Sequence, residues 1–344
     1  MENFVLYLFT LTAAFGCTLA VLPLLARGLG PYLPDKPGGL KTHSRVVPVV
    51  GGCGLFFGLA AVLIFIRLVT DFPSGTLHSL RGVILGGAII FLMGLADDLH
   101  KPAGLPIWAK LLLQALATAC LIRYGIVIRV FSSPLIAYLL TFLWVVGLTN
   151  AFNLLDIMDG LCTTQAMVCT LGLAVITLPS EWIYVNFAAL SLLGACLAFL
   201  PFNLSTKYKL FLGDSGANLL GFLIAALCLG TGYSGISNWG FLAPLWIAAV
   251  PIIDISFVTL ARIKQGKNPL KGSPDHAALR LRAHGWTDKR TVCIFAVAGI
   301  ISNIAAFAIT VCPPPIVAII SVLSVIATAT IFYGLFKLEA PHAR

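Results

Sequence analysis

Long apolar segments constrain the fold of this chain more than any other feature. We identify eleven of them, and each is close to the roughly 20 residues that a helix needs to cross a bilayer. Inside a bilayer the backbone amides find partners only within helices or a closed barrel, so these segments predict helices. The sequence therefore predicts an all-α polytopic membrane protein of about 11 transmembrane helices. The segments lie at 4–26, 47–69, 80–95, 107–124, 134–150, 160–179, 182–202, 215–233, 239–261, 291–312 and 314–336.

The amino-acid composition supports a single integral membrane domain over residues 1–344. Hydrophobic residues make up 59% of the chain and charged residues 10%, whereas soluble domains contain about 45–50% apolar and about 25% charged residues. The nine Cys residues are scattered, without the spacing of a disulfide framework or a zinc site. The net charge of +9 is not gathered into a basic tract interleaved with aromatic residues, so nucleic acid is not an expected partner.

Basic residues are distributed unevenly between the predicted loops. Of the 22 Lys and Arg residues, 18 fall in or beside loops on one side of the membrane and four on the other. Cytoplasmic loops carry the excess of Lys and Arg, so this asymmetry places the N-terminus outside and the C-terminus in the cytoplasm. Six Asp residues lie on the same predicted cytoplasmic side, where we therefore expect the chemistry. They occupy positions 97, 98, 156, 159, 214 and 275.

Four polar residues recur at every third position directly after an apolar segment. They are Asn150, Asn153, Asp156 and Asp159. On an α-helix, residues at every third position spread over about half of the circumference, and in a 3₁₀ segment they lie in line. Either conformation therefore keeps the four residues on one side. Carboxylates at the end of a membrane helix are costly unless they face water, a cation or one another. A functional site is therefore favoured over a helix that merely ends in polar residues.

Two adjacent carboxylates, Asp97 and Asp98, end the third apolar segment and precede Lys101. Neighbouring like charges raise one another's pKa unless a cation lies close. A cation site thus competes here with the simpler interpretation of a solvated helix end. Lys110 and Gln114 follow at i, i+4, a polar stripe that we place toward the same cavity.

A tight turn is predicted where glycines flank Asp214 and Ser215, just after Phe211. Free backbone N–H groups and the helix dipole at such a turn can bind phosphate, and Asp214 would hold a metal ion. The alternative is an ordinary N-cap formed by the Asp or the Ser. Several carboxylates at one membrane face suit a hard cation, Mg²⁺ or Mn²⁺.

The longest loop, 262–290, carries eight positive residues. Within it His276 and Arg280 are spaced i, i+4 on a short helix that Pro274 would start, so we expect them to share a face. A contact with phosphate or sugar is one interpretation. The other is a solvated basic loop that sets the topology of the chain.

Four motifs in order resemble those of the polyprenyl-phosphate N-acetylhexosamine-1-phosphate transferases. They are Lys41-x-His43 followed by Pro48-Val-Val-Gly51-Gly52, the Asp97-Asp98 pair, the Asn-x-x-Asn-x-x-Asp-x-x-Asp-Gly run at 150–160, and Gly213-Asp214-Ser-Gly. The resemblance covers about residues 36–285. It implies a bundle of about ten or eleven helices with a cytoplasmic active-site cleft in the bacterial inner membrane. It also implies transfer of a sugar-1-phosphate from a UDP-sugar to undecaprenyl or another polyprenyl phosphate, with release of UMP.

Within that family the chain is more similar to the bacterial UDP-GlcNAc:undecaprenyl-phosphate transferases than to the phospho-MurNAc-pentapeptide transferase, which stays an alternative. The last cytoplasmic loop departs from both branches, because 274–280 holds one His and an Arg where further His residues are typical. A secondary transporter is a less favoured alternative, since its charges would tend to lie at the bilayer midplane. A homodimer is a further expectation.

The resemblance also implies a role for each candidate residue. Asp214 would bind Mg²⁺ or Mn²⁺, with Asn153 nearby. Phosphate, uracil and sugar contacts would come from Lys41, Lys101, Lys110, Asn150, Phe211, His276 and Arg280. The catalytic carboxylates would be Asp97, as a base or a positioner of the lipid phosphate, together with Asp98, Asp156 and Asp159.

Overall fold

The chain is a helical bundle in a computed structural model that describes residues 2–36, 45–69, 76–180, 183–233, 238–268 and 275–338. In these residues the β-structure is one short antiparallel pair, β1 (Pro34–Asp35) with β2 (Val47–Pro48). The helices are α1 (Glu2–Gly28), α2 (Gly51–Val69), α3 (Thr76–Leu99), α4 (Ile107–Arg123), α5 (Pro134–Leu155), α6 (Leu161–Thr177), α7 (Ile183–Leu204), α8 (Gly213–Gly230), α9 (Ala243–Ile247), α10 (Ala249–Lys264), α11 (Ala277–Ala283), α12 (Asp288–Val311) and α13 (Pro314–Lys337), with 3₁₀ turns at Gly30–Tyr32, Leu178–Ser180 and Gly240–Leu242.

Ten of the eleven predicted spans each correspond to one helix, and the chain is an all-α polytopic membrane protein. In the described ranges eight helices are long and apolar enough to cross a membrane: α1, α2, α3, α5, α7, α8, α12 and α13. The predicted span at 239–261 is broken, because the helical stretch that ends with α9 meets α10 at an angle of 64°. Two further predicted spans, α4 and α6, are helices of only 17 residues.

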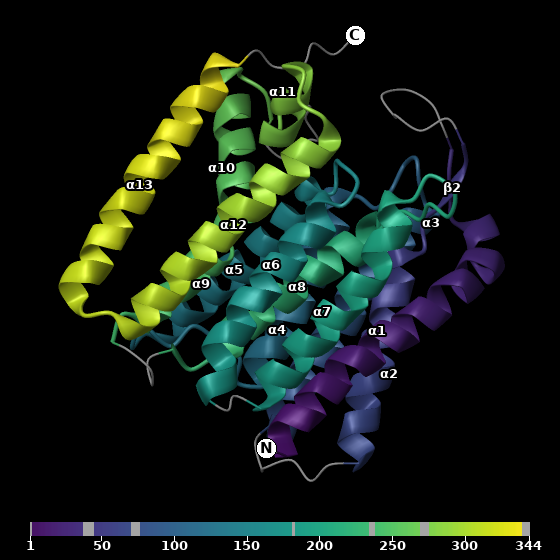
Figure 1. Ribbon diagram of the computed structural model, residues 1–344, viewed down its shortest axis with the longest axis horizontal. Helices are drawn as coiled ribbons and strands as arrows, with labels where there is room; N and C mark the ends of the chain where they lie inside the picture. Colours follow the sequence, from purple (N-terminus) through teal and green to yellow (C-terminus); the bar gives the residue numbers. More distant parts are fainter. Residues whose placement is uncertain are drawn as a thin grey trace.

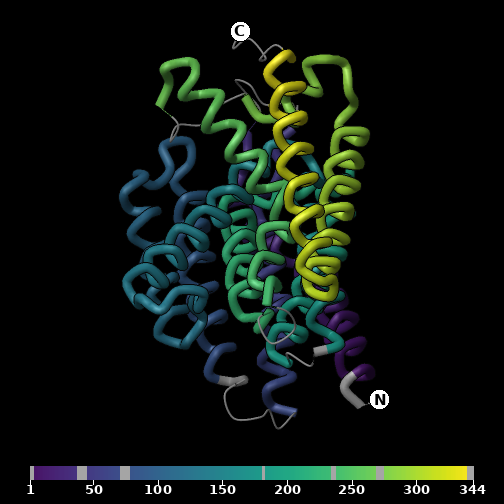
Figure 2. Tube along the Cα trace, turned by 90° about the vertical axis from the view of Figure 1, so that its left-hand side faces the viewer, coloured from purple at the N-terminus to yellow at the C-terminus, as the bar shows by residue number. Residues whose placement is uncertain are grey.

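Helix α8 forms the centre of the bundle. It packs against α3 on one side and α5 on the other, and it also contacts α2 and α6. Of its span, 83% is buried, whereas only 6% of the most apolar stretch of α13 is buried. Figure 1 accordingly shows α13 at the left edge of the bundle, and Figure 2, which looks from that side, shows it in front of the other helices. Neighbours on several sides therefore fix the position of the first residue of α8.

The two ends of the chain lie at opposite ends of the bundle. In Figure 1, α1 starts at the bottom and α13 ends at the top, near α11. The β1–β2 pair lies toward the top as well. Three described parts that were predicted to be cytoplasmic, the β1–β2 pair, α11 and the end of α13, thus lie at one end of the molecule.

Candidate active site

A close approach between α3 and α8 creates the centre of the candidate site. Gly94 of α3 permits it, because a Cβ atom there would lie 2.5 Å from the carbonyl oxygen of Asp214. One turn further along α3, the Asp98 carboxylate meets the start of α8. Its Oδ1 and Oδ2 accept hydrogen bonds from the backbone N–H groups of Asp214 and Ser215, each at 3.0 Å.

Asp98, on α3, therefore caps α8. Both predictions for this turn are wrong: the phosphate site at free N–H groups and the local N-cap by Asp214 or Ser215. These two N–H groups are occupied and are not available to a phosphate. Neither Asp214 nor Ser215 acts as a local cap, because Leu212 occupies the N-cap position and makes no side-chain cap bond. The turn into α8 is made by Gly213, whose φ of +76° favours glycine.

Three carboxylates and two ammonium groups meet at this point. Lys101 Nζ donates to Asp98 Oδ1 at 2.8 Å and to Asp214 Oδ1 at 3.2 Å. Lys110 Nζ donates to Asp97 Oδ2 at 2.7 Å and to Asp214 Oδ2 at 3.3 Å. We call these five residues the carboxylate–lysine cluster. Its formal charges sum to −1, because two of its three negative charges are balanced by lysines.

The loop between α3 and α4 is folded back onto the cluster. Asp97 Oδ1 accepts a hydrogen bond from the backbone N–H of Leu105 at 2.5 Å, which places the start of α4 and so Lys110. Burial lowers the pKa of Lys101, but the carboxylates of Asp98 and Asp214 outweigh this effect and raise the pKa above its ordinary value. Lys101 therefore carries its positive charge throughout the physiological range.

The three-residue polar repeat does not continue as one helix. Asn150 and Asn153 lie on α5, which ends at Leu155, while Asp156 and Asp159 lie in the turn that leads to α6. The predicted polar stripe on α4 reaches α5. Asn150 Nδ2 donates to Gln114 Oε1 at 3.0 Å, and Asn150 Oδ1 accepts a longer bond from Gln114 Nε2 at 3.4 Å. Gln114 is fully buried, so the pair joins α4 to α5.

Two residues that sequence reasoning did not assign to the site hold the 156–160 turn. Asn203, at the end of α7, accepts a hydrogen bond from Gly160 N at 2.6 Å and donates to Leu210 O at 3.0 Å. Lys209 forms an ion pair with Asp159, and its Nζ lies 5.6 Å from the centre of the Phe211 ring. The sequence offered only a sequon at Asn203 and one basic residue among many at Lys209.

Asp156 shares the electric field of the carboxylate–lysine cluster. Burial raises its pKa to about 7, the charges of Asp214, Asp98 and Asp159 add to the rise, and Lys101 opposes it. At neutral pH Asp156 is thus poised between its two protonation states. An ionised Asp156 needs a compensating positive charge.

Asp156→Asn should raise the unfolding temperature of the metal-free protein at pH 8. The pKa of Asp156 is higher in the folded protein than in the unfolded chain. The stability that the protonated Asp156 contributes is therefore complete below the pKa of the unfolded chain. It is lost as the pH rises through about 7, the pKa in the folded protein. An Asn cannot ionise, so its advantage should be larger at pH 8 than at pH 5. Thermal unfolding in detergent with EDTA measures both, with Asp288→Asn as a surface control. An equal advantage at both pH values would contradict the shift.

His276 and Arg280 do not share a helix face, so that prediction is wrong. His276 precedes α11 as its N-cap residue, and its Nδ1 lies 2.9 Å from Asp254 Oδ2. Asp254 Oδ1 also accepts from Ala277 N at 3.1 Å. Because His276 and Asp254 are both buried, this pair fastens α11 to α10.

The guanidinium of Arg280 is used within the protein. It donates to Asp275 Oδ1 at 3.1 Å and to the backbone oxygens of Leu335 and Leu338 at 3.1 and 2.7 Å. Arg280 therefore fixes α11 to the end of α13. Helix α11 nevertheless borders the site, since Ala278 packs in one cluster with Met158. Lys41 lies outside the described residues.

The protein groups at this site could supply only some of the ligands of a hard cation. In the part of the chain that the structure describes, no three His, Cys, Asp or Glu side chains are arranged to hold a metal ion among themselves. Mg²⁺ is commonly bound through one or two carboxylates, with water and substrate phosphates completing the shell. Asp214, whose contacts to the lysines are the longest in the cluster at 3.2 and 3.3 Å, fits that pattern.

Sequence comparisons identify the family to which this chain belongs. Residues 80–232, which include the whole cluster and the 156–160 turn, match the family described as glycosyl transferase family 4. A Bacillus subtilis protein named "Probable undecaprenyl-phosphate N-acetylglucosaminyl 1-phosphate transferase" is 30% identical over 283 residues, which is 79% of this chain and 76% of the relative. A Mycolicibacterium smegmatis protein named "Decaprenyl-phosphate N-acetylglucosaminephosphotransferase" is 26% identical over 94% of this chain and 89% of its own length.

A third relative comes from Escherichia coli and is named "Undecaprenyl-phosphate alpha-N-acetylglucosaminyl 1-phosphate transferase". It is 25% identical over 80% of this chain and 76% of its own length. The matches extend well beyond the cluster. The chain therefore belongs to the polyprenyl-phosphate N-acetylhexosamine-1-phosphate transferases of glycosyl transferase family 4.

Proposed function

We propose that this protein transfers N-acetylhexosamine-1-phosphate from a UDP-sugar to undecaprenyl or another polyprenyl phosphate, with UMP as the second product. The observation that carries the proposal is the carboxylate–lysine cluster, in which two ammonium groups and three carboxylates meet where α3 ends and α8 begins. Both helices are candidate membrane spans. A lipid-linked phosphate can reach such a position from the bilayer while a nucleotide arrives from water.

The reaction brings negative charges together. An oxygen of the lipid phosphate attacks the sugar-linked phosphorus, and the bond from that phosphorus to the oxygen of UMP breaks. Lys101 and Lys110 supply fixed positive charges for the phosphate oxygens. Asp214 and Asn153 are the proposed ligands of Mg²⁺ or Mn²⁺. The cation would neutralise the pyrophosphate and stabilise the leaving group.

A general base is not required for this attack. A phosphate monoester has its second pKa near 6, so most of the lipid phosphate is already dianionic at neutral pH. Asp97 is instead engaged by Lys110 and by the N–H of Leu105. We therefore assign it the role of holding Lys110 in place. Asp159, paired with Lys209 beside the Phe211 ring, is assigned to the nucleotide side.

UMP release tests the proposal directly. The purified protein, given UDP-GlcNAc, undecaprenyl phosphate and Mg²⁺, should release UMP, and omission of any one of the three should abolish release. UDP-MurNAc-pentapeptide in place of UDP-GlcNAc should give none. Release from the pentapeptide substrate alone would identify the alternative transferase, and no release from either would overturn the proposed reaction.

We also propose that all eleven helical segments cross the membrane. The N-terminus would lie outside, and the carboxylate–lysine cluster would lie at the cytoplasmic face. Thr206 and Ser132 are both exposed and lie at opposite ends of this arrangement. In intact cells, a membrane-impermeant thiol reagent should label a Ser132→Cys variant and spare a Thr206→Cys variant until the cells are opened. Labelling of Thr206→Cys from outside would reverse the orientation, and the unaltered protein measures the background from its own thiols.

A further inference from the structure

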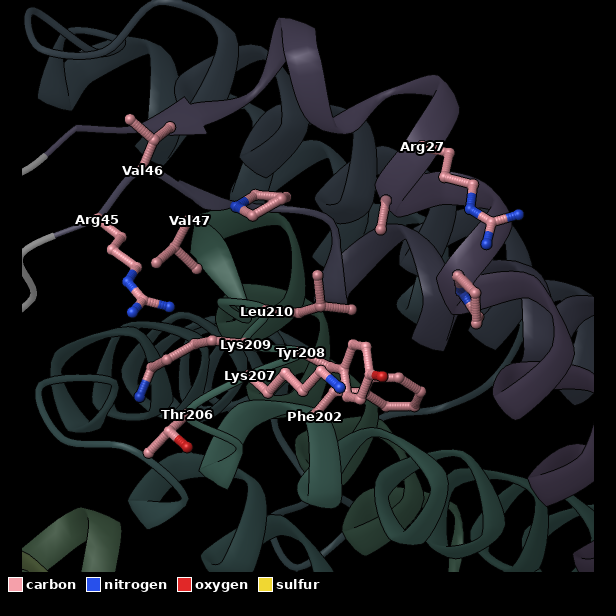
Figure 3. A pocket seen from close by; sticks show the side chains of 13 residues that line it. Arg27, Arg45, Val46, Val47, Phe202, Thr206, Lys207, Tyr208, Lys209 and Leu210 are labelled. Carbon is pink, nitrogen blue, oxygen red and sulfur yellow. The ribbon is translucent and has the colours of Figure 1, made fainter.

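A basic pocket lies beside the candidate active site, and Lys209 is the one lining residue that the proposed reaction also involves. It has a volume of about 940 Å³ and is formed by the end of α1, the strand β2 with the residues before it, and the 205–210 segment (Figure 3). With the carboxylate–lysine cluster it has no residue in common. The residues that line it are Pro23, Ala26, Arg27, Arg45, Val46, Val47, Pro48, Phe202, Thr206, Lys207, Tyr208, Lys209 and Leu210.

The charges of this pocket are of one sign. Four of its lining residues are basic, Arg27, Arg45, Lys207 and Lys209, and none of its lining residues is acidic. Figure 3 shows Arg45 and Lys209 at one end, Lys207 in the middle and Arg27 at the other end. In the described ranges neither Arg27 nor Lys207 forms an ion pair, and Lys207 lies 5.0 Å from the centre of the Tyr208 ring. The pocket is therefore suited to an anion.

The surroundings of the pocket have the character of a membrane interface. Leu24 and Leu204, on helices that are candidate membrane spans, are 65% and 52% exposed. Tyr32 and Tyr208 are 74% and 63% exposed. Aromatic residues beside basic ones are typical of the level of the lipid headgroups. Apolar surface for acyl chains thus adjoins positive charges for a phosphate.

We propose that the basic pocket binds the phosphate of an anionic phospholipid headgroup from the surrounding leaflet, and that this lipid is distinct from both substrates of the proposed reaction. Negative lipids attract basic residues near the membrane surface, and Arg can bind two phosphate oxygens at once. The exposed leucines on α1 and α7, Leu24 and Leu204, would accommodate the acyl chains. Lys209, paired with Asp159, gives the bound lipid a direct connection to the 156–160 turn.

Lipid binding by two charge-matched double variants tests this proposal. In Arg27→Gln/Lys207→Gln both unpaired cations of the pocket are removed. In Lys264→Gln/Lys337→Gln two cations are removed from α10 and α13, where each lies over an aromatic ring outside the pocket. Binding of phosphatidylglycerol and phosphatidylcholine to the purified full-length proteins can be measured by native mass spectrometry, with thermal unfolding as the check on folding.

We expect the pocket variant to bind phosphatidylglycerol at least about tenfold more weakly than the unaltered protein, and the matched control to bind it normally. Phosphatidylcholine should bind weakly to all three. Equal binding by the pocket variant and the unaltered protein would overturn the proposal, and so would an equal loss in both variants.

Displacement of the lipid by UDP-GlcNAc or by inorganic phosphate alone would assign the pocket to a soluble ligand instead. UMP release in neutral detergent should persist in the pocket variant, so a failure here is distinguishable from a failure of the proposed reaction.

Discussion

Asp214→Asn should lower UMP formation to below about 1% of the unaltered protein, a loss of at least about 2.7 kcal/mol of transition-state stabilisation. Asp214 is the carboxylate that both lysines approach, with its two oxygens 3.2 and 3.3 Å from Lys101 and Lys110. An amide in its place removes the negative charge that would hold the cation. The two ammonium groups would then lie near each other without that charge between them.

Initial rates at saturating Mg²⁺ measure this effect, together with the unfolding temperature. The fold should persist, because α8 is capped by Asp98 through backbone groups that the substitution leaves in place. Asp288→Asn is the matched control, since it removes one carboxylate from a surface ion pair with Arg282 at 3.4 Å. If the Asp214 variant kept a tenth of normal activity, a loss of only about 1.4 kcal/mol, it would not be the principal ligand.

Asp98→Asn should reduce both activity and stability. The Asp98 side chain is fully buried and accepts three hydrogen bonds, from Lys101 and from the N–H groups of Asp214 and Ser215. An Asn has one oxygen and one amino group, so one of these donors would face another donor. A buried donor without a partner costs about 1–3 kcal/mol. The start of α8, and Asp214 with it, would shift away from α3.

The contrast between the two variants is the decisive measurement. Asp98→Asn should lower the unfolding temperature while Asp214→Asn leaves it nearly unchanged, although both lose most of their turnover. An Asp98 variant with the normal unfolding temperature and low activity would mean that this carboxylate contacts substrate and does not position α8.

The sequence was sufficient to predict the fold class and most of the cluster. The length of the apolar segments predicted the helices, because the backbone of a segment that crosses a bilayer must satisfy its own hydrogen bonds. The charged residues at the segment ends could be assigned to one face because the loops alternate between two sides. Asp97, Asp98 and Asp214 were therefore expected together, and the structure brings them within reach of the same two lysines.

What the sequence could not supply was the identity of the partners across helices. Spacing along the chain does not say that the end of α3 touches the start of α8, so the capping role of Asp98 was not predicted. His276 and Arg280 do not lie on one helix face, as their i, i+4 spacing predicted, because α11 begins only at Ala277. Their partners, Asp254 and the carbonyl oxygens at the end of α13, come from other helices.

The cap that Asp98 provides also couples two membrane helices at the site. Helices α3 and α8 are in contact at Gly94 and are joined through Asp98, so they should move as one body. The 156–160 turn is held separately, by the hydrogen bond to Asn203, by the ion pair with Lys209 and by the packing of Met158 against Ala278. The ends of α3 and α8, with Asp214 and the two lysines that contact it, are therefore expected to keep a fixed geometry relative to one another.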